Sequence, residues 1–248
     1  MTNVITIIQA RFSSNRLPGK VLMKINNKTV LERVYERVSL ATNCNKVIVA
    51  TSNHQTDDAI YELCNQKNMN VFRGSLENVL ERFYLCSKYY SASTIVRVTA
   101  DCPLICPRTI DSALEKFNSN NFDYLSNTCP PEKSSFPDGS DVEIFTFDAL
   151  EKSYFNESKY KDNEHVTFQF WKEQSTYFSY LMEIEEDYSS LRYTLDYPED
   201  LEVIKFIISE LEKSGKDGSV KEIVEILMNN PEISKLNSKY HQGIGWKQ

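Results

Sequence analysis

A chain of 248 residues with 41% hydrophobic and 25% charged residues has the composition of a globular domain, which excludes disordered and collagen-like proteins. The formal net charge of −7 disfavours a nucleic-acid polymer as partner, because an acidic protein repels the phosphate backbone. No stretch approaches the roughly 20 apolar residues that cross a bilayer, and residues 1–10 have the pattern of a strand rather than a signal peptide. We therefore expect a cytoplasmic protein without membrane contact.

The first half of the chain alternates β-branched apolar runs with segments of helical periodicity. Strands are predicted at 4–8, 47–51, 70–73 and 94–99, and helices at 29–41, 57–68, 77–90 and 108–117. Thr56 is the predicted N-cap of the second helix. This alternation predicts an α/β fold in which helices cover both faces of a mostly parallel sheet, giving three layers.

The second half begins with a loop from Cys129 to Gly139 that contains three prolines. Beyond it we expect strands at 141–145, 177–184 and 191–195 and helices at 147–155, 164–171, 198–213 and 219–229. Pro198 opens the third of these helices, where its missing N–H costs little. We predict a single domain over residues 1–248, with a small extra lobe at about 130–190 that covers a site or contacts a partner subunit.

The six cysteines and three histidines show no metal-ligand spacing. There is no CxxC pair, and His54, His165 and His241 are far apart in the sequence. We expect reduced, buried thiols and no zinc site.

The loop after the first predicted strand, residues 9–20, gathers three cations in an acidic chain: Arg11, Arg16 and Lys20. Ligands of open α/β sheets bind at the carboxyl ends of the strands, so this position favours an anion site over a solvated basic loop. Arginine forks and a lysine ammonium suit phosphate oxygens, and Ser14 can complete the cradle with backbone N–H groups. The loop matches neither the Walker A pattern nor the GxGxxG fingerprint, which argues against a P-loop enzyme and a dinucleotide dehydrogenase.

Two aspartates follow later predicted strands in the same manner. Asp101 comes after strand 94–99 and is followed by Pro103, and Asp196 comes after strand 191–195. Either aspartate alone is as compatible with a turn or a helix cap as with a ligand. Together with the cationic loop they favour one or two magnesium ions held against a triphosphate.

Six sequence motifs occur in order along the chain: QARFSSNRLPGK, FRGSLENVLERF, VTADCPLI, PDGSDVEIF, NEHVT and LDYPEDLE. In these motifs the chain resembles the spore-coat-polysaccharide-type cytidylyltransferases. These enzymes are relatives of the CMP-ulosonate synthetases, which activate 3-deoxy-manno-octulosonate and sialic-acid-like (acylneuraminate) sugars. The resemblance covers most of the chain and implies a Rossmann-related, GT-A-like nucleotidyltransferase fold.

The resemblance also implies roles for individual residues. The nucleotide would be bound by Gln9, Ala10, Arg11, Ser14, Arg16, Lys20, Gly74, Ser75 and Arg82. The catalytic set would be Arg11, Arg16, Lys20, Asp101 and Asp196, of which the two aspartates would hold Mg²⁺. The acceptor would face Asp141, Glu143 and His165. The lobe at about 130–190 would then serve acceptor binding or the contacts of a homodimer.

The implied reaction transfers CMP from CTP to a sugar or sugar-like acceptor and releases pyrophosphate, in the synthesis of bacterial surface polysaccharide. The residues leave the acceptor open among an ulosonic acid, a phosphorylated polyol and another surface sugar. One alternative is a glycosyltransferase of the same fold, which is disfavoured because the aspartates follow separate strands instead of forming a DxD-like motif. The other is a non-catalytic nucleotide-binding protein, which the complete set of charged residues disfavours.

Overall fold

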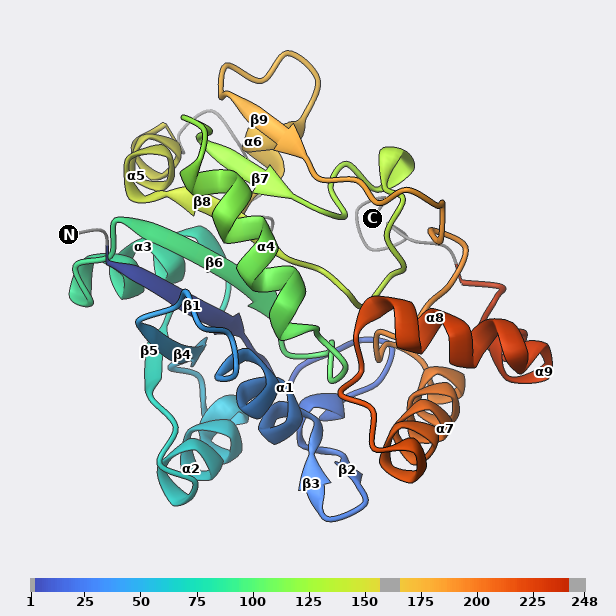
Figure 1. The fold of residues 1–248 in the computed structure, drawn as a ribbon. Coiled ribbons are helices and arrows are strands. Elements are labelled where there is room, and N and C mark those ends of the chain that lie inside the picture. The colour runs from blue at the N-terminus through green and yellow to red at the C-terminus, as the bar shows by residue number, and fades with distance from the viewer. Residues whose placement is uncertain (1–2, 157–165, 241–248) are drawn as a thin grey trace.

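The computed structural model describes residues 3–156 and 166–240, and the strands of this part form one seven-stranded sheet and a separate hairpin (Figure 1). The sheet strands are β1 (Val4–Gln9), β4 (Lys46–Ser52), β5 (Val71–Gly74), β6 (Thr94–Thr99), β7 (Tyr124–Ser126), β8 (Glu143–Thr146) and β9 (Ser179–Leu181). Their order is β5-β4-β1-β6-β8-β7-β9, and β8 runs antiparallel to both of its neighbours while the other pairs are parallel. The hairpin consists of β2 (Lys24–Ile25) and β3 (Lys28–Thr29). The predicted mostly parallel sheet is confirmed.

Helices cover both faces of this sheet. They are α1 (Val30–Val38), α2 (Asp58–Gln66), α3 (Val79–Tyr89), α4 (Pro107–Asn118), α5 (Phe147–Phe155), α6 (Phe168–Trp171), α7 (Pro198–Ser214), α8 (Val220–Asn229) and α9 (Pro231–Ser234). Helices α1, α2 and α4 pack on one face and α3, α5 and α6 on the other, which confirms the three layers. Helices α7 and α8 form a further apolar cluster beside the sheet. Among the described residues, no helix has the length and apolar content to cross a bilayer.

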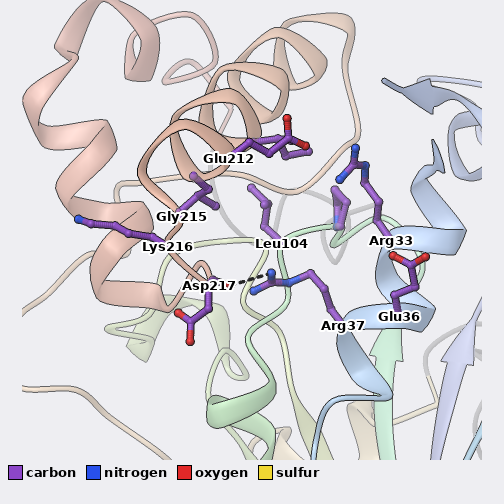
Figure 2. A pocket seen from close by; sticks show the side chains of 11 residues that line it. Arg33, Glu36, Arg37, Leu104, Glu212, Gly215, Lys216 and Asp217 are labelled. Atoms are coloured by element: carbon purple, nitrogen blue, oxygen red, sulfur yellow. Dashed lines mark hydrogen bonds between the residues drawn. The ribbon is translucent and has the colours of Figure 1, made fainter. Parts of the chain in front are cut away.

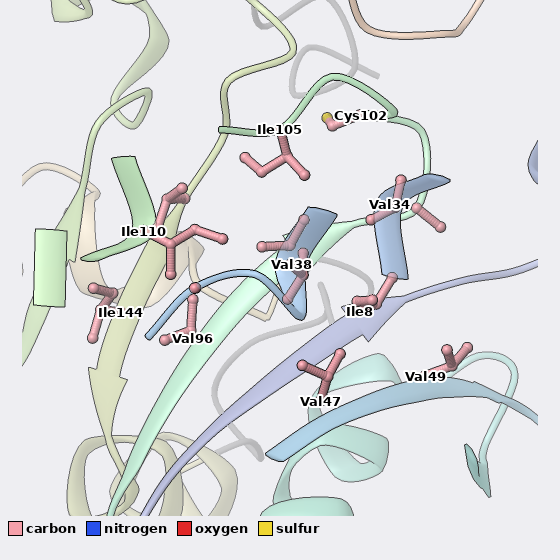
Figure 3. Close-up of a cluster of buried hydrophobic side chains, with 14 of the residues drawn as sticks. Ile8, Val34, Val38, Val47, Val49, Val96, Cys102, Ile105, Ile110 and Ile144 are labelled. Carbon is pink, nitrogen blue, oxygen red and sulfur yellow. The ribbon is translucent and has the colours of Figure 1, made fainter. Parts of the chain in front are cut away.

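The central strand β1 shows why the strands of this sheet are continuous apolar runs in the sequence. Ile5 and Ile7 belong to the cluster under α3, whereas Val4 and Ile8 belong to the cluster under α1, and all four are at most 5% exposed. A parallel strand that is covered on both faces needs apolar residues at successive positions. Figure 3 shows the cluster on the α1 face, where Ile8 lies below Val34 of α1.

Local signals explain where the helices begin. Helix α1 starts with a capping box at Thr29, and α7 starts at Pro198, as predicted. The prediction that Thr56 caps α2 is wrong. The ring of His54 accepts a hydrogen bond from the Thr56 N–H and starts the short 3-10 helix η2 (Gln55–Asp57), which leads into α2.

The predicted strand at 191–195 is also wrong. The segment is extended, but within the described residues its one β-bridge joins Arg192 to Asp138. Its backbone bonds to loops instead, since the Tyr193 N–H donates to the Asp138 carbonyl and the Leu195 N–H to the Asp101 carbonyl, each at 2.8 Å. These bonds bring the segment before α7 against the turn that follows β6.

Other elements of the second half are shorter than expected or were missed. The strand expected at 177–184 is reduced to β9, and the described part of the helix expected at 164–171 is α6. Strand β7 was not predicted, because three residues are too few to show a period. Strands β8 and β9 of the stretch 130–190 belong to the main sheet, and the assignment of this stretch as a lobe for the acceptor or a dimer stays a prediction.

Arg37 of α1 joins the C-terminal helices to the rest of the domain (Figure 2). Its guanidinium donates to the carbonyls of Ile105, Asp217 and Gly218 at 2.6, 2.9 and 2.8 Å. Arg37 also lines a pocket of about 350 Å³ between α1 and α7, and none of the described residues predicted for the site lines that pocket. The bonds of Arg37 hold the α7–α8 connection against the segment after Asp101.

Candidate active site

The loop after β1 has a closed shape that turns Lys20 inward. The Gly19 N–H donates to the Phe12 carbonyl at 2.9 Å. Gly19 has a φ of +70°, and a Cβ there would lie 3.1 Å from the Phe12 ring, so this turn requires glycine. The next residue, Lys20, begins the 3-10 helix η1 (Lys20–Leu22) and is only 8% exposed.

Lys20 bridges the two aspartates that were predicted as metal ligands. Its Nζ lies 2.5 Å from Asp101 Oδ2 and 2.7 Å from Asp196 Oδ1. Burial disfavours the charged ammonium, but the attraction of both carboxylates outweighs burial and raises the pKa of Lys20. In turn, Lys20 lowers the pKa of Asp101 and of Asp196 against the opposing effect of their burial. All three side chains are therefore charged at neutral pH.

Arg16 reaches the same point from the rim of the loop. Its Nη2 lies 2.9 Å from Asp196 Oδ1, and its side chain is 28% exposed. The guanidinium also lies 5.4 Å from the centre of the Tyr197 ring, which stacks on the ring of Tyr240 at 3.6 Å. Arg16 and Lys20 thus present two positive charges to one carboxylate, one at the edge of the site and one at its floor.

The remaining predicted loop residues take different positions. Ala10 is 1% exposed and continues the backbone pairing of β1, because its N–H donates to the Ala50 carbonyl at 3.1 Å. The Ser14 hydroxyl accepts from the Leu17 N–H at 3.3 Å and so shapes the loop. Arg11 is exposed to solvent.

The turn from β5 to α3 brings together the three residues predicted to shape the nucleotide pocket. A Cβ on Gly74 would lie 2.9 Å from Arg82 Cγ, so only glycine allows the two elements to pack this closely. Arg82 is fully buried and donates from Nη1 to the Ser75 carbonyl at 2.8 Å. Burial lowers the pKa of Arg82 to about 10, and the nearby charge of Arg11 adds to this effect against the opposing charge of Asp57. Its Nε and Nη2 are buried without a partner among the described residues.

Glu143 and Gln9 are linked through Arg97. The Arg97 guanidinium donates to Gln9 Oε1 at 3.0 Å and to Glu143 Oε1 at 2.7 Å. Glu143 is 3% exposed, and its second carboxylate oxygen has no partner among the described residues. Arg97 therefore links Glu143 to a residue that was predicted to bind the nucleotide, and the role of Glu143 toward the acceptor stays a prediction.

Of the other two predicted acceptor residues, the structure describes Asp141 but not His165. Asp141 Oδ2 accepts from the Gly139 N–H at 2.8 Å, and burial raises the pKa of Asp141, with a further contribution from Asp101. His165 lies outside the described residues. Asp141 is therefore a carboxyl group close to the aspartate pair, and its role toward an acceptor stays a prediction.

Arg192 contacts Asp196, and no role was predicted for it. Its Nη2 holds Asp196 Oδ2 at 3.1 Å, and its guanidinium also grips Asp200 at 3.0 and 3.1 Å and pairs with Asp138. Asp200 is fully buried and accepts from the Asp196 and Tyr197 N–H groups, so it satisfies the backbone at the start of α7, whose N-cap residue is Tyr197. No local pattern indicated this role, because residues 192–196 are extended and a spacing of four residues brings side chains together only within a helix.

The comparison that decides the family is a match along most of the chain. The sequence profile of the cytidylyltransferase family matches residues 5–216, a range that includes Lys20, Asp101 and Asp196. The chain belongs to the cytidylyltransferase family. The resemblance drawn from the six motifs is thereby confirmed, and the chain is a nucleotidyltransferase.

Three relatives illustrate the similarity. The spore coat polysaccharide biosynthesis protein SpsF of Bacillus subtilis is 30% identical over 248 residues, which are 94% of this chain and 98% of the relative. A solved cytidylyltransferase structure from Leptospira borgpetersenii is 31% identical, has a TM-score of 0.87, and covers 97% of this chain and 100% of that chain. A 3-deoxy-manno-octulosonate cytidylyltransferase of Solibacter usitatus is 37% identical over 113 residues, 45% of this chain and 43% of the relative. The predicted nucleotidyltransferase fold is confirmed.

The donor set of this cytidylyltransferase suits magnesium more than a structural transition metal. Within residues 3–156 and 166–240, no three His, Cys, Asp or Glu side chains cluster closely enough to hold a metal ion by themselves. The six cysteines are free thiols, of which five are buried and Cys44 is half-buried. Asp101 and Asp196 nevertheless share one cation, the ammonium of Lys20, which marks a position where positive charge is stabilised. Magnesium is commonly held by one or two carboxylates with phosphate oxygens as further ligands, and these two aspartates fit that pattern.

Proposed function

We propose that this cytidylyltransferase transfers CMP from CTP to a sugar or sugar-like acceptor, in a magnesium-dependent reaction that serves the synthesis of bacterial surface polysaccharide. The observation that carries the proposal is the convergence of Lys20 and Arg16 on Asp101 and Asp196. The similarity to a spore coat polysaccharide biosynthesis protein and to 3-deoxy-manno-octulosonate cytidylyltransferases supports an acceptor of the sugar class.

In the proposed reaction an acceptor oxygen attacks the α-phosphorus of CTP. The new O–P bond forms as the bond from the α-phosphorus to the bridging oxygen breaks, and pyrophosphate leaves with that electron pair. The acceptor proton passes to solvent or to a nearby carboxylate. Magnesium, when bound by Asp101 and Asp196, supplies charge neutralisation for the triphosphate.

The chain's own residues provide the rest of the catalytic effect. Lys20 and Arg16 are paired with carboxylates in the structure, and they can exchange these partners for phosphate oxygens when a nucleotide binds. The exchange would free oxygens of Asp101 and Asp196 for the metal while keeping every charge matched. Positive groups placed in advance at the leaving pyrophosphate stabilise the charge that develops there.

A pyrophosphate-release screen tests this proposal. The four nucleoside triphosphates are each combined with a panel of ulosonic acids, other acidic sugars and sugar phosphates, with magnesium and with EDTA. We expect release that requires CTP, an acceptor and magnesium together. CTP binding by calorimetry without turnover on any acceptor would indicate a binding protein. Consumption of a nucleotide-sugar, added in place of the triphosphate, without release of pyrophosphate would indicate a glycosyltransferase.

The predicted homodimer belongs to the same proposal, since the stretch 130–190 was predicted to carry acceptor or dimer contacts. Sedimentation equilibrium of the full chain checks it directly. A mass near the 28.7 kDa of one chain at micromolar concentration would contradict the dimer without affecting the proposed chemistry.

A further inference from the structure

Asp57 is a fully buried carboxylate at the carboxyl end of β4 that no predicted role explains. It is 0% exposed, and its Oδ1 accepts from the Phe12 N–H at 2.7 Å. Its Oδ2 accepts from the Ser52 N–H at 3.0 Å and from the Thr51 hydroxyl at 3.1 Å. A buried charge is tolerated when hydrogen bonds satisfy it, and here the two oxygens join two separate segments of chain.

The charge on Asp57 has a specific structural use. A carboxylate accepts hydrogen bonds on both oxygens, whereas an asparagine presents one acceptor and one donor group. Asparagine at this position would lose either the bond to Phe12 or the bonds to Thr51 and Ser52. Only a carboxylate keeps both ends of the connection, so Asp57 fixes the start of the loop after β1 to the end of the neighbouring strand.

From Phe12 the connection continues to the floor of the site. The Phe12 carbonyl accepts the Gly19 N–H at 2.9 Å, and the Phe12 ring packs where a Cβ on Gly19 would be. Gly19 is followed at once by Lys20, whose ammonium sits between Asp101 and Asp196. Two hydrogen bonds and one peptide link therefore separate the Asp57 carboxylate from the Lys20 backbone.

We propose that Asp57 is a positioning residue for nucleotide binding, because it holds residues 12–20 in the shape that presents Lys20 and Arg16 to the triphosphate. This inference rests on the proposed function of those two cations. Asp57 does not itself touch the triphosphate. It acts by fixing the backbone from which both cations extend.

The variant Asp57→Asn tests the proposal, with Asp111→Asn as a matched control. Asp111 of α4 also accepts three hydrogen bonds, from the N–H and hydroxyl of Thr42 and from the N–H of Asn43. These two residues lie in the loop before β4, at the opposite edge of the sheet from Asp57. Calorimetry with CTP and magnesium measures the Kd for each full-length protein. We expect the Kd to rise about tenfold or more in Asp57→Asn, the size of one lost charge-assisted hydrogen bond, and to stay within about twofold in Asp111→Asn.

Amide hydrogen exchange gives a second readout that does not depend on nucleotide. In Asp57→Asn the amides of Phe12 and Gly19 should exchange about tenfold faster than in the wild type, while the amide of Ile7 in β1 stays protected. If Asp57→Asn does not fold, hydrogen exchange of the ligand-free wild type tests the proposal, because the proposal requires the Phe12 amide to be strongly protected from exchange. A Phe12 amide that exchanges like an unstructured chain overturns the inference.

The outcomes separate this inference from the proposed function. If the wild type binds CTP and Asp57→Asn binds it equally well, the positioning role is wrong and the proposed function stands. If the wild type does not bind CTP, the proposed function fails. The exchange rates of Phe12 and Gly19 then decide whether Asp57 shapes the loop.

Discussion

Replacing Lys20 with methionine should destabilise the folded enzyme at neutral pH and make its stability respond to magnesium. Methionine keeps the unbranched stem but removes the ammonium that lies 2.5 Å from Asp101 and 2.7 Å from Asp196. Removing one partner of a buried ion pair costs about 3–5 kcal/mol, because the other charge stays buried without its partner. Asp101 is 24% exposed and Asp196 keeps Arg16 and Arg192, so we expect a smaller loss, about 2–3 kcal/mol.

The pH dependence of this loss has a definite sign. Lys20 lowers the pKa of both aspartates in the folded protein, so their contribution to stability is present above the ordinary carboxyl pKa of about 3.9 and is lost as the pH falls below it. The pKa of Lys20 is raised in the folded protein, so the ammonium contributes to stability at neutral pH, and this contribution is lost only as the pH rises through the raised pKa. The difference in the free energy of unfolding between wild type and Lys20→Met should therefore be largest near pH 7 and become smaller in acid.

Urea denaturation of both proteins at neutral and acidic pH, with and without magnesium, measures these effects. In Lys20→Met, magnesium can occupy the position between the two carboxylates, so it should raise the midpoint more than in the wild type. Lys28→Met is the control, because Lys28 pairs with Glu36 at the surface, where ion pairs contribute about 0–1 kcal/mol. Equal stability of Lys20→Met and wild type at pH 7, or a gap that widens in acid, would refute the reasoning.

Three further substitutions test other parts of the site. Asp101→Asn should lower kcat by about 100-fold or more at saturating magnesium with an unchanged circular dichroism spectrum, and activity near wild type would disprove the metal role. Gly74→Ala should cost about 1–3 kcal/mol of stability in urea and weaken CTP binding in calorimetry, because its Cβ would lie 2.9 Å from Arg82 Cγ; an unaffected Kd would remove the turn from the nucleotide pocket. Arg192→Lys keeps the charge but loses the forked contacts, so both the melting temperature and kcat should fall, and an unchanged kcat would mean that Asp196 does not need this support.

The parts of the fold that could be predicted from sequence are those where burial requires a recognisable pattern of apolar residues. Strands β1, β4 and β6 are apolar at successive positions because helices cover both faces, and the helices between them keep a periodic apolar face. Strand β7 shows no such pattern in three residues. The extended segment around Tyr193 has the composition of a strand, but its hydrogen-bond partners are the loops at Asp138 and Asp101, which no local pattern identifies.

The residues of the candidate site also fall into those that could be predicted from sequence and those that could not. Lys20 and Asp101 could be predicted to converge, because each follows a strand whose carboxyl end lies at the same edge of the sheet. Asp196 was placed with them on the expectation of a strand at 191–195, but it follows an extended segment that bonds to the loops at Asp138 and Asp101. The support around Asp196 could not be predicted, because Arg192 collects partners from positions 138, 196 and 200. Distances between such positions depend on the completed fold, and a single sequence contains no record of them.

One contact near the end of the chain affects when the site can form during synthesis. Asn237 is 1% exposed, and its amide donates to Asp200 Oδ1 at 2.8 Å and to the Arg192 carbonyl at 3.2 Å. The pair that orients Asp196 therefore obtains its last hydrogen bonds only after the ribosome has translated position 237. A nascent chain or a fragment truncated before that residue would contain every charged group of the site and still lack the bonds that fix one of its two central carboxylates.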